Sequence, residues 1–339
     1  MKRRLVTAVA LGSLAVLTGC SDEGAPLSFD GPTAAAPAPS ETKGGAARER
    51  GAKTVMPTGP KAEFTTQNTI EDGTRIGVTT LHGKKSGFTG KVWVWAPQQY
   101  FDPAYARSGF PVLIALPGGN GYPNNYWMGT DLKLQSSIST WSREGRSLPF
   151  LVVMPVLNPD AEHYYDGSDI PGQPKMGTWM TEDVPDFVRA NFRTFASRDG
   201  WAFMGSSSGG FVGLKSVLKH PDKFKAVIAS GPDTEPDSPL WAGHEKERRA
   251  NDPKELARAL GAKPDSGGGD VYLAFQAGSE ESALDDVRSF IGTYTKGPVK
   301  TRLQVIEGGG HNARTYVKGM GDGSIQWISA HMQAPIPSR

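Results

Sequence analysis

Residues 201–209 read Trp-Ala-Phe-Met-Gly-Ser-Ser-Ser-Gly, and this stretch decides the fold of the chain. The apolar run Trp201–Met204 predicts a buried strand, and Gly209–Lys219 has the residue spacing of a helix. Between them stands the pattern Gly-x-Ser-x-Gly, which at a strand-to-helix junction forms a sharp turn that exposes its central serine. Glycines flank such a serine because strand and helix pack too closely there for a Cβ atom. The stretch therefore predicts that Ser207 is a nucleophile.

Strand patterns and helical patterns alternate on both sides of this turn. The predicted strands are Phe64–Ile70, Arg75–Leu81, Lys91–Ala96, Val112–Leu116, Phe150–Met154, Trp201–Met204, Ala226–Ala229, Val271–Phe275 and Arg302–Ile306. The predicted helices are Asp131–Trp141, Thr181–Phe192, Gly209–Lys219, Lys254–Leu260, Ala283–Tyr294 and Ser324–Met332. The inner strands are continuous apolar runs, as in parallel strands covered on both faces, whereas an Asp-Gly turn joins the first two as a hairpin. The pattern predicts an α/β fold with a doubly wound, mostly parallel sheet and antiparallel N-terminal strands.

A serine hydroxyl becomes an effective nucleophile beside a base, and we look for a histidine later in the chain. The chain has six histidines, and His311 is distinguished by following a terminal strand pattern. It lies in residues 307–312, Glu-Gly-Gly-Gly-His-Asn, where glycines give the loop freedom to present an imidazole over the edge of the sheet. We expect His311 to be the base.

A carboxylate that orients this imidazole is expected between the serine and the histidine in chain order, after a strand. Residues 276–281 read Gln-Ala-Gly-Ser-Glu-Glu and follow the predicted strand Val271–Phe275. Either Glu280 or Glu281 is suited to the role. Asp285 and Asp286, slightly later in the chain, are further alternatives.

A negatively charged acyl-transfer intermediate needs two backbone N–H groups aimed at one point, an oxyanion hole. Ser208 supplies one of them by its place directly after the nucleophile, at the start of a helix. The other is expected from the loop after Val112–Leu116, which reads Pro-Gly-Gly-Asn-Gly-Tyr over residues 117–122. We predict that Gly119 supplies it, with Gly118 as the alternative.

The N-terminal segment predicts export from the cell. Three basic residues precede the apolar run Leu5–Leu17, which is too short to span a bilayer and is typical of a signal peptide over residues 1–19. The run ends in Leu-Thr-Gly-Cys20, which resembles the bacterial lipobox. That resemblance implies that Cys20 is acylated and anchors the protein to the outer face of a membrane. Cys20 is also the single cysteine of the chain, so neither a disulfide nor a cysteine-ligated metal site is expected.

Composition divides the remaining chain into two parts. Residues 20–62 are rich in Ala, Pro, Gly, Ser and Thr and predict a disordered tether, because such a stretch buries too little surface to offset its ordering entropy. Residues 63–335 are long enough for one α/β catalytic domain. Without residues 1–19 the chain keeps 34 basic and 35 acidic residues, so its charge gives no reason to expect a nucleic-acid partner.

Several of these segments together resemble the esterase D and bacterial mycolyltransferase branch of the α/β-hydrolases. The likeness runs from Val92 to Met332 and is carried by Gly205–Gly210, His220–Phe224, Ser230-Gly231, Gly309–Asn312, Asn251–Pro253, Trp179–Pro185 and Trp327. It implies an α/β-hydrolase fold, a Ser–Asp/Glu–His triad, and no metal or organic cofactor. Many hydrolases of this fold place the acid three residues after a glycine, which favours Glu281 here, and mycolyltransferases use glutamate as the acid.

Two departures from the mycolyltransferases bear on the substrate. Pro117–Asn120 stands where they have an Asp-Gly-Leu-Arg type segment, and the mature chain has no cysteines for their disulfide loop. Both departures favour simple ester hydrolysis. We therefore predict a serine esterase at the cell surface that acts on a small-molecule, glycan or lipid ester. Acyl transfer of the mycolyltransferase type and a non-catalytic surface-binding lipoprotein are the alternatives, although intact Ser207 and His311 argue against the latter.

Overall fold

The computed structural model describes residues 24–31, 53–262 and 269–338. The strands are β1 (Pro26–Leu27), β2 (Thr54–Val55), β3 (Phe64–Thr69), β4 (Arg75–His82), β5 (Thr89–Trp95), β6 (Val112–Leu116), β7 (Leu151–Pro155), β8 (Thr194–Phe195), β9 (Trp201–Ser206), β10 (Ala226–Ser230), β11 (Val271–Gly278) and β12 (Val299–Ile306). The α-helices are α1 (Leu134–Arg143), α2 (Met176–Thr178), α3 (Val184–Asn191), α4 (Ser208–Lys219), α5 (Glu245–Arg249), α6 (Pro253–Gly261), α7 (Ala283–Tyr294), α8 (Ala313–Gly319) and α9 (Ile325–Ser329). The predicted signal peptide and Cys20 lie outside the described residues.

Ten of the described strands form one sheet, in the order β1-β3-β4-β5-β7-β6-β9-β10-β11-β12. The neighbours from β1 to β7 are antiparallel. From β7 to β12 every neighbouring pair is parallel. The predicted architecture, a mostly parallel sheet with antiparallel N-terminal strands, is confirmed.

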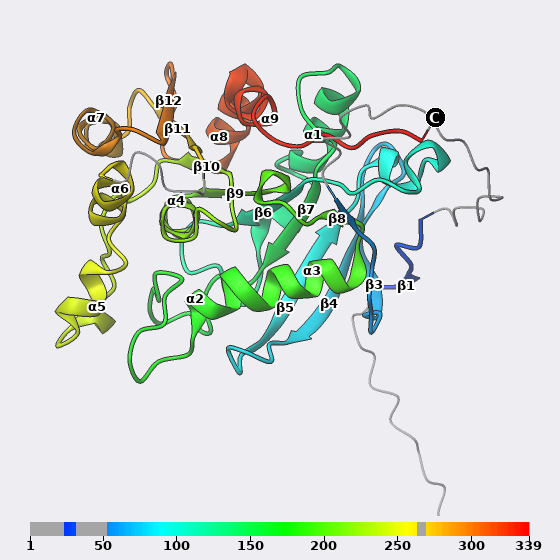
Figure 1. Cartoon of the computed structure of the whole chain (residues 1–339), viewed down its shortest axis with the longest axis horizontal. Helices are drawn as coiled ribbons and strands as arrows, with labels where there is room; N and C mark the ends of the chain where they lie inside the picture. The colour runs from blue at the N-terminus through cyan, green and yellow to red at the C-terminus, as the bar shows by residue number, and fades with distance from the viewer. Residues whose placement is uncertain (1–23, 32–52, 263–268, 339) are drawn as a thin grey trace, which may run out of the picture.

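Helices cover both faces of the parallel strands. Figure 1 shows α3 and α4 on one side of the sheet, and α1, α8 and α9 on the other. Every residue of β6, β7, β9 and β10 is buried, which explains why these strands are continuous apolar runs in the sequence. Each large apolar side chain buried in this way contributes about 1.5–3 kcal/mol to stability.

Some predicted helices differ from the observed ones. The predicted helix Asp131–Trp141 is observed as α1, which begins three residues later. The predicted helix Thr181–Phe192 is divided into a π-helical turn, η4 (Trp179–Asp183), and α3, with Pro185 in the first turn of α3, where no backbone N–H donor is needed. The predicted helix Ser324–Met332 shortens to α9. Helices α2, α5 and α8 were not predicted, because each is less than three turns long and its periodicity is weak.

Parts of the predicted tether pack against the domain instead. Strand β1 pairs with β3, and β2 pairs with β8. Phe29 is 8% exposed, with its ring centroid 5.0 Å from that of Phe64 and 5.2 Å from that of Phe192. For residues 24–31 and 53–62 the prediction of a disordered tether is therefore wrong, because a few apolar side chains cover the outer strand of the sheet. The domain begins before residue 63.

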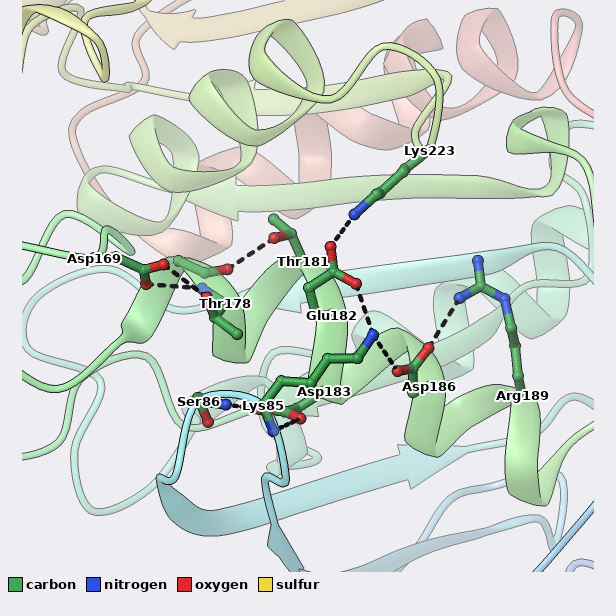
Figure 2. Close-up of polar contacts among 11 residues, drawn as sticks. Lys85, Ser86, Asp169, Thr178, Thr181, Glu182, Asp183, Asp186, Arg189 and Lys223 are labelled. Carbon is green, nitrogen blue, oxygen red and sulfur yellow. Dashed lines mark hydrogen bonds and ion pairs between the residues drawn. The ribbon is translucent and has the colours of Figure 1, made fainter.

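The segment Trp179–Pro185, part of the resemblance to mycolyltransferases, joins three parts of the fold (Figure 2). The Asp183 carboxylate accepts the backbone N–H groups of Lys85 and Ser86 at 3.0 and 2.8 Å, and so holds the turn between β4 and β5. Glu182 forms ion pairs with Lys85 and with Lys223, which lies in the loop after α4. These contacts give the two acidic residues a structural role.

No helix in the described ranges of the chain has the length and apolar character needed to cross a membrane. No group of three or more His, Cys, Asp or Glu residues in the same ranges is placed to hold a metal ion.

Candidate active site

The serine turn has the strained geometry that its sequence predicts. Ser207 lies between β9 and α4 with φ 52° and ψ −124°, a conformation that residues other than glycine rarely adopt. A Cβ atom at Gly205 would lie 2.4 Å from the Gly209 carbonyl carbon, and one at Gly209 would lie 2.3 Å from the Pro117 carbonyl oxygen. Neither position has room for a side chain. The Ser207 N–H donates to the Ser230 carbonyl at 2.8 Å, which ties the turn to the end of β10.

A carboxylate and an imidazole meet at the same edge of the sheet. His311 Nδ1 lies 2.8 Å from Glu281 Oε2, and Glu281 Oε1 accepts the Gly278 N–H at 2.6 Å. The Glu281 side chain is 1% exposed, whereas that of His311 is 49% exposed. The carboxylate favours the tautomer that carries its proton on Nδ1, which leaves Nε2 as the basic nitrogen. The pair is thus arranged as an orienting acid and a base.

Gly231 connects the serine turn to this pair. It follows Ser230 directly and has φ +48°. A Cβ atom at Gly231 would lie 2.5 Å from Glu281 Oε2 and 2.9 Å from His311 Nδ1, so any side chain would displace both groups. In the described part of the chain, the hydrogen-bonding contacts of the imidazole are with Glu281 and Tyr316. The Ser207 hydroxyl is not among these partners in the described residues. In serine–histidine sites, the hydrogen bond between the two side chains often tightens only when substrate binds.

The other candidate acids lie at the surface. The side chains of Glu280 and Asp286 are exposed. Asp285 is also exposed and forms an ion pair with Arg288, one turn along α7, at 3.2 Å. Of the four carboxylates weighed from the sequence, the structure brings Glu281 into contact with His311.

Sequence reasoning missed one member of this cluster, Tyr316 on α8. Its hydroxyl lies 2.8 Å from Glu281 Oε2 and 2.8 Å from His311 Nδ1. Burial, followed by the hydrogen bond to Glu281, raises the pKa of Tyr316, so the hydroxyl stays protonated and donates to the carboxylate. Asn312, whose side chain accepts the Thr315 N–H at 3.0 Å, is a sequence signal for the start of α8, but it does not indicate which α8 side chain reaches Glu281.

The two glycines predicted for the oxyanion hole are in different situations. The Gly118 N–H donates to the Tyr126 hydroxyl at 2.8 Å and is therefore already engaged. Gly119 has φ +65°, and its N–H has no hydrogen-bond partner among the residues that the structure describes. The Ser208 N–H opens α4, where the first N–H groups of a helix have no acceptor within the helix. Gly119 and Ser208 are the pair suited to bind an oxyanion.

Comparison with known proteins then fixes the family. A sequence model of the Esterase family matches residues 89–330, which hold the serine turn, the imidazole and the buried carboxylate. The chain belongs to the Esterase family. No curated protein sequence matches it significantly.

Solved structures resemble this esterase in fold. A ferulic acid esterase has a TM-score of 0.62 at 18% identity, with 76% of this chain and 99% of that chain covered. An S-formylglutathione hydrolase from Agrobacterium tumefaciens has a TM-score of 0.61 at 19% identity, covering 80% and 99% of the two chains. A fluorophosphonate-binding serine hydrolase of Staphylococcus aureus has a TM-score of 0.59 at 17% identity, covering 76% and 98%. The α/β-hydrolase fold is confirmed, and the esterase is a hydrolase.

A buried lysine holds the helix α4, which begins directly after Ser207. Lys215 of α4 donates through Nζ to the backbone carbonyls of Asp166 and Gly167 and to the Ser168 hydroxyl. The Asp166 carboxylate in turn accepts the indole N–H of Trp241 at 2.7 Å. Burial lowers the pKa of Lys215 to about 7 and raises that of Asp166 to about 6. The lysine joins α4 to the loop after β7 and so stabilises the helix on which the serine turn rests.

Proposed function

We propose that this member of the Esterase family is a serine esterase with the triad Ser207, His311 and Glu281. The observation that carries the proposal is the 2.8 Å contact between His311 Nδ1 and a Glu281 side chain that is 1% exposed. A buried carboxylate on one imidazole nitrogen leaves the other nitrogen free to activate a serine hydroxyl for attack. The proposal keeps Glu281 as the acid, because Glu280 lies at the surface.

The proposed reaction has two tetrahedral steps. His311 Nε2 takes the proton of the Ser207 hydroxyl as the oxygen attacks the ester carbonyl carbon, and the carbonyl oxygen becomes an oxyanion. The N–H groups of Gly119 and Ser208 bind this oxyanion. When the intermediate collapses, the ester C–O bond breaks, and His311 returns the proton to the leaving alcohol. Water, deprotonated by His311, then attacks the acyl-serine and releases the carboxylic acid and the free serine.

The neighbours in fold suggest which esters to test. One is named as a ferulic acid esterase, and another as an S-formylglutathione hydrolase. The first name indicates an ester of ferulic acid, and the second a formyl group joined to the thiol of glutathione. We propose a small-molecule, glycan or lipid ester as the substrate of this chain. We further propose that Cys20 is lipidated and that hydrolysis takes place on the outer face of the cell membrane, as the lipobox-like sequence Leu-Thr-Gly-Cys implies.

Covalent labelling tests the proposal directly. A fluorophosphonate probe is expected to react with the folded wild type and to modify the tryptic peptide that contains Ser207. Ser207→Ala and heat-denatured wild type are expected not to react. A folded wild type that the probe does not modify would refute the esterase proposal. Hydrolysis of p-nitrophenyl esters of increasing chain length and of methyl ferulate, with and without a sugar as competing acceptor, then separates ester hydrolysis from acyl transfer.

A further inference from the structure

The loop that carries Gly119 is bound to the serine turn at two points. At the first, the Tyr126 hydroxyl accepts the Gly118 N–H at 2.8 Å and is also hydrogen-bonded to the Ser206 hydroxyl. At the second, the Ser208 hydroxyl donates to the Gly119 carbonyl oxygen at 2.8 Å. The two serines in these contacts are the residues directly before and after Ser207.

These contacts hold the peptide groups on either side of the proposed oxyanion donor. The Gly118 N–H belongs to the peptide group that precedes the one carrying the Gly119 N–H, and the Gly119 carbonyl belongs to the one that follows it. A peptide group can turn only by changing the backbone angles next to it. Here both neighbouring groups are held by hydrogen bonds, one to the Tyr126 hydroxyl and one from the Ser208 hydroxyl. The direction of the Gly119 N–H is therefore set from both sides.

The backbone at Gly118 packs closely against the serine turn. A Cβ atom at Gly118 would lie 3.2 Å from the Ser206 carbonyl oxygen and 3.3 Å from Ser207 Cβ. Burial raises the pKa of Tyr126, so its hydroxyl stays neutral and can donate one hydrogen bond while it accepts the Gly118 N–H. Ser206 is buried, and its contact with Tyr126 is shielded from competing water.

We infer that Ser206 with Tyr126, and Ser208, are positioning residues for oxyanion binding. The three consecutive serines then have separate roles: the middle one attacks, and the outer two hold the loop that supplies the Gly119 N–H. The inference rests on the proposed esterase function and deepens it, because the same turn fixes both the attacking oxygen and the donor that stabilises the charge. Misplacement of a catalytic group by about 1 Å costs on the order of 100-fold in rate.

The test uses Ser208→Ala, Ser206→Ala and Tyr126→Phe in the full chain, with an activated ester and the matching thionoester as substrates. Sulfur accepts hydrogen bonds weakly, so a well-formed oxyanion hole favours the oxygen ester over the thionoester. Each variant is expected to lower kcat on the oxygen ester roughly 10- to 100-fold with KM changed less than about twofold, because one donor is misplaced but not removed. The rate ratio of oxygen ester to thionoester is expected to fall by a similar factor.

Matched controls remove similar groups far from the turn. Tyr100→Phe removes a buried hydroxyl that also accepts a backbone N–H, that of Arg193 at 3.2 Å. Ser147→Ala removes a hydroxyl that also donates to a backbone carbonyl, that of Leu148 at 2.8 Å. Both are expected to keep the wild-type rate ratio. Ser208→Thr keeps the hydroxyl at a half-buried position and is expected to restore most of the rate lost in Ser208→Ala.

The outcomes separate this inference from the proposed function. An active wild type, with variants that keep its kcat or lose rate equally on the oxygen ester and the thionoester, would overturn this inference alone. A wild type that neither hydrolyses esters nor reacts with the fluorophosphonate would overturn the proposed function, and this inference with it. A selective loss on the oxygen ester in Ser208→Ala, recovered in Ser208→Thr, would support it.

Discussion

Glu281→Gln is the substitution that tests the proposed triad most sharply, because it changes one atom of a buried side chain and its charge. In the wild type, Oε1 accepts the Gly278 N–H at 2.6 Å, and Oε2 faces His311 Nδ1 and the Tyr316 hydroxyl. The amide oxygen of glutamine is expected to take the place of Oε1, because the Gly278 N–H requires an acceptor. The amide NH₂ group then faces His311 Nδ1, and the imidazole must accept there and carry its proton on Nε2. That proton blocks the nitrogen that should deprotonate Ser207.

The size of the effect follows from two contributions. Reversing the amide to restore the active tautomer leaves the buried Gly278 N–H without an acceptor, at a cost of about 1–3 kcal/mol. The active tautomer also loses the negative charge that stabilises the imidazolium form, worth about another 1–2 kcal/mol, the difference between charged and neutral hydrogen bonds. Together these raise the barrier by roughly 2–5 kcal/mol, which lowers kcat by roughly 30- to 5,000-fold.

The assay is steady-state hydrolysis of a p-nitrophenyl ester, with the melting temperature measured in parallel. Glu280→Gln is the matched control, since Glu280 is adjacent in sequence but exposed, and surface charges contribute little to stability or catalysis. We expect Glu281→Gln to lose activity while its melting temperature stays near that of wild type, and Glu280→Gln to be nearly fully active. The opposite ranking would move the role to Glu280. Near-normal rates in both variants would show that the acid lies elsewhere, at Asp285, Asp286 or another strand.

Three further variants test the surroundings of the site. Tyr316→Phe removes a hydrogen-bond donor to Glu281 and is expected to lower kcat roughly tenfold with little change in KM. The control Tyr165→Phe loses a hydroxyl–carboxylate contact with Asp160 and is expected to keep the wild-type kcat. Equal kcat values in the two variants would contradict a role for Tyr316. Burial lowers the pKa of His220 from 6.5 to about 4, so the unfolded chain binds a proton that the native state does not, and the free energy of unfolding is expected to fall as pH drops from 6.5 to 4. His220→Gln should flatten that part of the urea-unfolding profile, and parallel profiles would show that the histidine contributes nothing. Cys20→Ala is expected to release the protein from the membrane fraction or block its processing; unchanged fractionation, with an unmodified N-terminal peptide in mass spectrometry of the wild type, would refute lipid anchoring.

The sequence predicted the central strands of the sheet because they depend on local patterns, although several strand ends differ by two or three residues. Continuous apolar runs marked the buried parallel strands, and Gly-x-Ser-x-Gly marked the turn at Ser207. His311 and Glu281 were found because functional groups in such a sheet gather at the carboxyl ends of parallel strands. Choosing Glu281 over Glu280 was possible only through family resemblance, since the two differ in burial and not in local sequence.

Contacts between segments far apart in the sequence could not be predicted in this way. Tyr316 reaches Glu281 because α8 turns back over the end of β11, and no local pattern of α8 announces that approach. The contact between Tyr126 and Ser206 joins residues 80 positions apart. Strand β1 was missed for a related reason, since two residues without strong periodicity become a strand only when an unpaired edge, here β3, is available.

The register of the sheet explains why loops so short suffice to assemble the site. Ser206 of β9 pairs in register with Ser230 of β10, and Ser230 pairs with Gln276 of β11, so these strands end at nearly the same level. Ser207 stands one residue after β9, Glu281 three after β11, and His311 five after β12. Each successive group has a longer reach because its strand lies farther from β9 in the sheet. A longer insertion in any of these loops would add conformational freedom, and the contacts among these groups would have to offset its loss on ordering.

The glycines at positions 231 and 278 allow the backbone to approach these groups closely. A Cβ atom at 231 would lie 2.5 Å from Glu281 Oε2, and one at 278 would lie 2.0 Å from the Gly309 carbonyl oxygen. Loop length and close backbone approach together bring His311 against Glu281, the contact on which the proposed triad rests.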